Sequence, residues 1–231
     1  MPIHTAGGWE ASNGKIYLES SRVDDNAFPF FPPEDGRMPS PETKADFVRW
    51  ELDLSQSSGS TVPDPVVILD LPSEFPRIDK RFMTKEYEYV FLNVFLPEKS
   101  DGSKTILHGL NALATHSNRT GKTRFFYAGD ESLVQGQIFI PREKDAAEGD
   151  GWVISVERRA DMRCDLIVLD TREFGKPVAI VQLPFHVKAQ IHGNWVDAGR
   201  LGEKKSLVRE VGEAAASGRD FGTADLRGLC D

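Results

Sequence analysis

Short runs of alternating or wholly apolar residues, separated by turn residues, dominate this chain of 231 residues. Alternation of apolar and polar positions is typical of strands that turn one face to a core. The pattern predicts strands at residues 15–23, 47–54, 66–71, 86–96, 137–140, 152–157, 166–170 and 178–183. Several short strands with turn residues between them indicate an all-β sandwich, barrel or propeller.

Turn residues refine this prediction at three places. Asn13-Gly14 before the first strand is a strong hairpin signal, and residues 113–126 predict a hairpin that turns at residues 119–121. Residues 24–41 predict a loop, because their prolines and Asp-Gly dipeptide sustain neither a ladder nor a helix. No internal sequence repeat accompanies the strands.

The C-terminal tail departs from the strand pattern. Residues 204–217 have apolar positions at helical spacing and end before Gly218, a common helix stop. We therefore predict two regions, a β-rich part at residues 1–200 and a helical, flexible tail at residues 201–231.

Charge and cysteine content limit the classes of partner. The 28 basic and 36 acidic residues give a net charge of −8, which argues against a nucleic-acid or anionic-membrane partner. Cys164 and Cys230 form neither a disulfide framework nor a metal-ligand set, which is typical of a reducing, cytoplasmic compartment. Residues 1–10 show no basic region followed by an apolar one, and no uninterrupted apolar run reaches membrane-spanning length, which predicts a soluble protein.

The segment at residues 183–195 carries the clearest chemical signal. It places His192 after an apolar strand and before Gly193, and a neutral imidazole in such a turn suits iron, zinc or copper. The segment resembles the C-terminal signature of the carotenoid cleavage oxygenase family, which includes lignostilbene and resveratrol dioxygenases. The matching residues are Leu183, Pro184, Val187, His192, Gly193 and Trp195, whereas His186, Lys188 and Gln190 replace the family's usual Arg, Pro and Gly. The resemblance implies that His192 is the last of four histidines that bind a catalytic ferrous ion, Fe(2+).

Two upstream segments resemble the same family. Residues 73–79, Ser-Glu-Phe-Pro-Arg-Ile-Asp, are similar to a motif whose glutamate orients an iron-binding histidine, which implies that role for Glu74. Residues 4–10, His-Thr-Ala-Gly-Gly-Trp-Glu, are similar to the motif of the third iron ligand, which implies that His4 binds iron. We interpret Arg77 and Asp79 as a structural pair that anchors a loop.

The chain also departs from the family pattern. Gly136 and Gln137 stand where the family has Glu-Pro, and the loss of such a metal-orienting carboxylate typically costs roughly 10–100-fold in metal affinity or activity. The segments that would carry the first two iron histidines have no counterpart. We interpret His108 and His116 as surface or strand histidines and His186 as a surface histidine.

The resemblance covers roughly residues 3–200 and about the second half of a typical family member, a seven-bladed β-propeller with iron on its axis. It implies an all-β chain that holds only the later blades and leaves a sheet edge open to self-association, which the C-terminal helix could cover. The implied activity is that of a non-haem Fe(II) dioxygenase. Such an enzyme adds O2 across a conjugated C=C bond of an apolar small molecule (a carotenoid, apocarotenoid or stilbene) to give two carbonyl products.

Two alternatives remain open from the sequence. The missing histidines and Gly136 favour a catalytically inactive partial propeller that acts as a binding or interaction module. A reading that ignores the resemblance is a generic β-rich binding module with incidental histidines. The amount of iron bound per chain separates the oxygenase from both alternatives.

Overall fold

The computed structural model describes residues 2–24, 34–36, 45–99, 109–189 and 191–202. The chain divides into two compact units, Met1–Trp195 and Val196–Asp231. All strands in the described residues belong to the first unit, and the described part of the second unit holds the 3₁₀ turn η5 (Ala198–Arg200). The helix predicted at residues 204–217 and most of the loop predicted at residues 24–41 lie outside the described residues.

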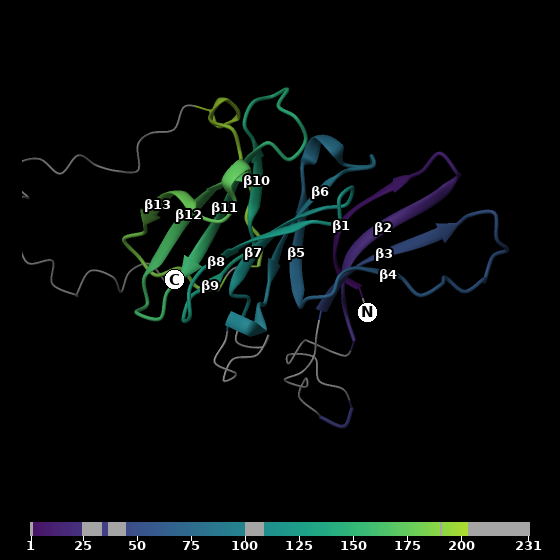
Figure 1. Ribbon diagram of the computed structural model, residues 1–231, viewed down its shortest axis with the longest axis horizontal. Helices are drawn as coiled ribbons and strands as arrows, with labels where there is room; N and C mark the ends of the chain where they lie inside the picture. Colours follow the sequence, from purple (N-terminus) through teal and green to yellow (C-terminus); the bar gives the residue numbers. More distant parts are fainter. Residues whose placement is uncertain (1, 25–33, 37–44, 100–108, 190, 203–231) are drawn as a thin grey trace, which may run out of the picture. The chain divides into compact units, whose positions relative to one another are not determined.

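Three antiparallel sheets follow one another along the first unit (Figure 1). The first has the order β1 (Pro2–Glu10), β2 (Lys15–Val23), β3 (Ala45–Asp53) and β4 (Val66–Leu69). The second has the order β5 (Ser73–Ile78), β6 (Tyr89–Val94), β7 (Ala112–Ser117) and β8 (Thr123–Tyr127). The third has the order β10 (Ile138–Pro141), β11 (Gly151–Arg158), β12 (Cys164–Asp170) and β13 (Pro177–Gln182), and the short β9 (Leu133–Val134) also pairs with β11. Each sheet is thus a meander in which consecutive strands are neighbours, apart from the short β9 in the third.

The prediction of an all-β chain is confirmed. Helical structure in the described part of the first unit is limited to the 3₁₀ turns η1 (Lys80–Phe82), η2 (Pro97–Lys99) and η4 (Thr171–Glu173). None of the helices among the described residues is long and apolar enough to cross a membrane. Each predicted strand is present, β2 with the predicted ends and the others with shifted ends, and the predicted hairpin at residues 113–126 corresponds to β7 and β8.

Strands β1 and β5 were not predicted from the pattern. β1 contains Gly7 and Gly8, and β5 contains Pro76, and both residue types weaken a strand signal. β5 also has a bulge, because Glu74 pairs with Asn93 while Arg77 pairs with Phe91, which leaves one extra residue on β5. This irregular strand is the one on which the candidate site depends.

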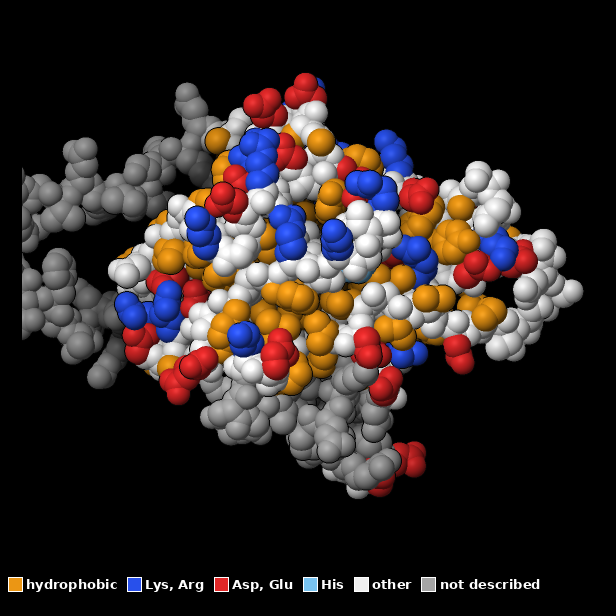
Figure 2. Space-filling view, viewed as in Figure 1, with side chains coloured by type: hydrophobic (Ala, Val, Ile, Leu, Met, Phe, Trp, Pro, Cys, Tyr) orange, Lys and Arg blue, Asp and Glu red, His pale blue; other side chains and the backbone are white. Residues whose placement is uncertain are grey.

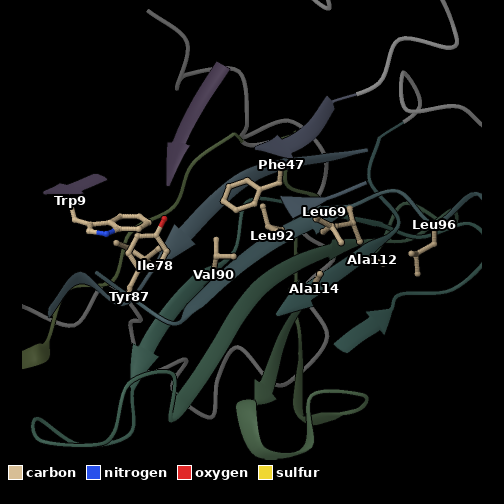
Figure 3. Packing of buried hydrophobic residues seen from close by; sticks show 11 residues of the cluster. Trp9, Phe47, Leu69, Ile78, Tyr87, Val90, Leu92, Leu96, Ala112 and Ala114 are labelled. Atoms are coloured by element: carbon tan, nitrogen blue, oxygen red, sulfur yellow. The ribbon is translucent and has the colours of Figure 1, made fainter. Parts of the chain in front are cut away.

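Two hydrophobic cores hold the sheets together. The first joins the first sheet to the second, and Figure 3 shows Phe47 above Leu92 and Trp9 beside Tyr87 within it. The rings of Trp9 and Tyr87 meet edge to face with centroids 5.3 Å apart. The second core joins the second sheet to the third, with Phe91 and Phe139 stacked at 4.7 Å. Because side chains alternate along a strand, β6 is buried on both faces.

A buried carboxylate also links the first two sheets. Glu19 on β2 is 0% exposed and accepts hydrogen bonds from Arg49 Nε at 2.8 Å and from the Tyr87 hydroxyl at 2.5 Å. Asn118 Nδ2 donates to the same carboxylate at 3.3 Å. The guanidinium of Arg49 lies 5.2 Å from the centroid of the Trp9 ring. Glu19 is therefore a paired charge within the first core.

The interpretation of His116 as a strand residue is confirmed, but its surface placement is wrong, because β7 is buried on both faces. His116 is 4% exposed, and its Nδ1 lies 2.9 Å from the hydroxyl of Thr123. Burial lowers the pKa of His116, and nearby Arg49 acts in the same direction while Glu19 opposes it. His108 lies outside the described residues.

This lowered pKa should make the fold sensitive to mild acid. The unfolded chain binds a proton at His116 near pH 6.5, whereas the folded chain binds it only at lower pH. The free energy of unfolding should therefore decrease as the pH falls through and below about 6.5. Urea unfolding between pH 7.5 and pH 5.5 should show a smaller loss of stability for His116→Gln than for the wild type. Equal losses in the two proteins would contradict this assignment.

Candidate metal centre

The structure brings together three side chains from distant parts of the sequence. His4 lies on β1, Glu74 on β5, and His192 in the segment after β13. Nδ1 of His4 contacts the carboxylate oxygen Oε2 of Glu74. The two imidazole rings lie nearly perpendicular, at 87°, with centroids 4.8 Å apart. The residues that the sequence singled out thus form one cluster.

The bulge of β5 orients Glu74. The backbone N–H of Phe75 donates to Glu74 Oε2 at 2.7 Å, so one carboxylate oxygen faces both this amide and His4. Phe75 adopts a left-handed backbone with φ 53°, a conformation that costs about 1–3 kcal/mol in a residue other than glycine. Its ring packs against both histidines, with centroids 5.4 Å from His4 and 6.0 Å from His192. One strained backbone position therefore lies beside the histidine pair.

The segment that carries His192 is held from β5 and from the turn that follows it. Arg77 Nη2 donates to the carbonyl oxygen of Gly193 at 3.2 Å. Lys80 Nζ donates to the side-chain oxygen of Asn194 at 2.5 Å. One short stretch of chain therefore supplies the carboxylate for His4 and the donors that fasten the residues after His192.

The predicted pairing of Arg77 with Asp79 is wrong. Asp79 caps the η1 turn by accepting from the backbone N–H of Arg81 at 3.1 Å, and it also accepts from Arg81 Nε at 3.0 Å. A carboxylate at the start of a helical turn is well placed for donors two residues ahead. Arg77 is thereby left to reach Gly193, a contact for which the sequence held no signal.

The donor set suits a metal that prefers imidazole nitrogen. Although His192 is exposed, partial desolvation lowers its pKa, with His4 and Arg77 acting in the same direction and Glu74 opposing them, which favours the neutral, ligating form. Because a carboxylate can only accept, Nδ1 of His4 donates to Glu74 and Nε2 remains for a ligand. Among the described residues, no group of three or more His, Cys, Asp or Glu side chains could hold a metal ion. The cluster therefore offers two imidazoles, together with a carboxylate oxygen that already contacts His4.

The family-like Glu-Pro position holds something other than a carboxylate. A Cβ atom at Gly136 would lie 2.2 Å from the carbonyl oxygen of Ile191, so the backbone before His192 occupies the space of a side chain. The neighbouring Gln137 is fully buried and donates from Nε2 to the carbonyl oxygen of Phe75 at 3.1 Å. A glycine next to a strand can mark such a close backbone approach, which was the available sequence signal.

His186 is remote from this cluster in its contacts. Its Nδ1 donates to the carbonyl oxygen of Met162 at 3.0 Å and lies 3.6 Å from Cys164 Sγ. The residue is exposed, as predicted.

The described residues thus combine three antiparallel sheets with a histidine pair of which one member is oriented by a carboxylate. Residues 1–197 match the family model described as RPE65, retinal pigment epithelial membrane protein. The chain belongs to this RPE65/carotenoid oxygenase family, which confirms the resemblance inferred from the motifs. Family membership also excludes the alternative hypothesis that the chain is a generic β-rich binding module unrelated to this family.

Relatives in this family carry related names. The chain is 65% identical over 220 residues to resveratrol cleavage oxygenase 1 of Botryotinia fuckeliana, covering 95% of the chain and 40% of that protein. It is 32% identical to lignostilbene-alpha,beta-dioxygenase isozyme III of Sphingomonas paucimobilis, covering 86% of the chain and 41% of the relative. The crystal structure of Pseudomonas brassicacearum lignostilbene dioxygenase matches with a TM-score of 0.78 and 34% identity, over 85% of this chain and 42% of that one. The chain thus spans less than half the length of these relatives.

Proposed function

We propose that this chain is part of a non-haem Fe(II) dioxygenase that cleaves a conjugated C=C bond in an apolar small molecule. The observation that carries the proposal is the His4–Glu74–His192 cluster, in which a carboxylate orients one of two adjacent imidazoles. The names of the relatives include resveratrol cleavage oxygenase and lignostilbene dioxygenase, which support a substrate of the stilbene type.

His4 and His192 would hold the ferrous ion, since neutral imidazole nitrogen is a suitable iron ligand. When bound, the iron would supply the activation of O2, whose two atoms end in the two carbonyl products formed from the cleaved alkene. Glu74 accepts a hydrogen bond from Nδ1–H of His4, which fixes the proton on Nδ1 and leaves Nε2 free for the metal. The Phe75 ring packs against both imidazoles, while His4 stays partly exposed and His192 exposed.

We further propose that the three meanders are blades of a seven-bladed β-propeller. Consecutive four-stranded antiparallel sheets are the repeating unit of that fold, and the described residues contain two four-stranded sheets followed by a third in which the short β9 adds a fifth strand to β10–β13. In this arrangement residues 1–200 contribute later blades and residues 201–231 form a tail. The remaining iron ligands would come from outside the described residues.

The edge strand β13 favours association with a further strand. Its side chains are largely exposed, including Val178, Ile180 and Val181 at 52%, 49% and 50%, and it carries no charged residue. Uncharged apolar edges are ready templates for strand addition. We propose self-association at this edge.

On the face shown in Figure 2, basic and acidic side chains are interspersed among the described residues, so that face offers no single-sign field to a charged polymer.

Iron content tests the proposed function. The full chain, purified without oxygen in the presence of ferrous ion, should retain iron, at one ion per chain or one per associated pair. Light scattering on the same sample measures the association. Addition of O2 and a hydroxylated stilbene should then give two aldehydes in equal amounts, detected by chromatography.

A chain that is folded but retains no iron and yields no aldehyde would contradict the oxygenase proposal. That outcome would favour the inactive partial propeller, which the lack of a third ligand among the described residues also supports.

A further inference from the structure

The dipeptide Gly136-Gln137 lies between strands β9 and β10 and contacts the supports of both histidines. The backbone just before it is firmly held. Asn93 Nδ2 donates to the carbonyl oxygens of Val134 and Gln135, at 3.1 and 2.9 Å. The hydroxyl of Ser155 donates to the same Gln135 oxygen at 2.6 Å. Buried hydrogen bonds of this kind make the link between the strands a rigid platform.

Gln137 acts on the side of the cluster that carries His4. Its side chain is 0% exposed and donates to the carbonyl oxygen of Phe75, while its Oε1 has no hydrogen-bond partner among the described residues. The Phe75 carbonyl oxygen is therefore the hydrogen-bond partner of the Gln137 side-chain amide. Phe75 holds the left-handed turn that aims its own N–H at Glu74, and Glu74 contacts His4.

Gly136 acts on the side that carries His192. Any Cβ atom at this position would meet the carbonyl oxygen of Ile191 at 2.2 Å, and the contacted atom belongs to the backbone, so no side-chain rotation relieves it. Beyond His192, the carbonyl oxygen of Gly193 is held by Arg77 at 3.2 Å. His192 thus lies between two points at which the backbone is constrained.

We infer that Gly136 and Gln137 are positioning residues that set the spacing of the two imidazoles, one through close backbone approach and the other through an amide hydrogen bond. The family-like motif has a carboxylate here, and this chain uses neighbouring backbone contacts in its place. The inference deepens the proposed function, because the spacing matters for iron, but the positioning itself exists without metal.

Histidine-selective ¹⁵N NMR of the metal-free full chain tests the role of Gln137, since the protein has only 5 histidines. In Gln137→Met, a side chain of similar length without a donor, the ring ¹⁵N shifts of His4 should move from those of the Nδ1–H tautomer toward exchange-averaged values. Asn111→Leu is the matched control. It removes a buried amide that bonds the Leu96 backbone at 2.8 and 3.1 Å, and it should leave the His4 signals unchanged. Unchanged His4 signals in Gln137→Met, or equal shifts in both variants, overturn the inference.

The ring-proton NOE between His4 and His192 tests the role of Gly136, because their centroids are 4.8 Å apart. Gly136→Ala should abolish this NOE. Gly151→Ala should retain it, although its Cβ would meet an equally close backbone oxygen, that of Ile140 at 2.1 Å. An NOE that persists in folded Gly136→Ala overturns the inference. If Gly136→Ala does not fold, the Gln137→Met comparison decides.

These measurements separate this inference from the proposed function. Displaced histidine signals in the variants, together with a wild type that binds no iron, would support the positioning role and contradict the oxygenase. Unchanged histidine signals in the variants, together with a wild type that retains iron, would contradict the positioning role and support the oxygenase.

Discussion

Replacing His192 with alanine should abolish retention of ferrous iron by the purified chain. His192 is one of the two imidazoles in the cluster, and the described residues offer no third ligand to compensate for its loss. Removal of an outer partner of a metal ligand costs roughly 10–100-fold in affinity, so removal of a ligand itself should exceed about 100-fold. Iron per chain, measured by mass spectrometry after anaerobic desalting, provides the readout.

His186→Ala is the matched control for this experiment. His186 is six positions earlier and exposed, and its contacts are to Met162 and Cys164 instead of to the cluster. It should leave the iron content at the wild-type level. Equal iron in His192→Ala and wild type would show that the metal binds elsewhere. Equal loss in both variants would point to a general effect of removing a histidine.

Replacing Glu19 with alanine should lower the free energy of unfolding by about 3–5 kcal/mol, the cost of breaking a buried ion pair on one side. The carboxylate is fully buried, and its removal leaves the Arg49 guanidinium and the Tyr87 hydroxyl without their acceptor at the boundary of two sheets. The side chain of Arg49 is 27% exposed, so some rehydration should keep the loss near the lower end of this range. Urea unfolding at pH 7 measures the loss.

Glu51→Ala is the corresponding control on the same sheet. Glu51 lies on β3 and pairs with Lys15 and Tyr17 at an exposed position. Because solvent screens this pair, its removal should leave the unfolding midpoint nearly unchanged. A destabilisation as large as that of Glu19→Ala would mean that the sheet depends on charge pairing in general, and that the buried location of Glu19 is not decisive.

Much of the fold could be predicted because strand formation depends on local alternation. β2 begins and ends where the pattern after Asn13-Gly14 predicts, at Lys15 and Val23. β1 and β5 escaped the same reasoning, since Gly7, Gly8 and Pro76 lower intrinsic strand preference. Pairing with neighbouring strands overrides that local preference, and a single sequence does not reveal the pairing.

In the candidate site, too, the sequence predicted some features and missed others. The short contiguous motifs around His4, Glu74 and His192 resemble those of the family, and this resemblance implied metal chemistry. The pairing of Arg77 with Asp79 was predicted wrongly, because Asp79 accepts from Arg81 two residues ahead, while Arg77 donates to the Gly193 carbonyl more than a hundred residues away. From the sequence, Gly136 was interpreted as the loss of a metal-orienting carboxylate, whereas in the structure its missing side chain makes room for the Ile191 backbone.

The sequence by itself therefore determined the all-β class, the family, and the identity of the histidines and carboxylate proposed to act on iron. These features reside in local patterns of polarity and in short motifs. Only the tertiary structure decided that Glu74 meets His4, that the two imidazoles lie edge to face, and that Arg77, Gly136 and Gln137 support them. Such contacts join residues far apart along the chain, and they exist only once the sheets have packed and the bulge in β5 has formed.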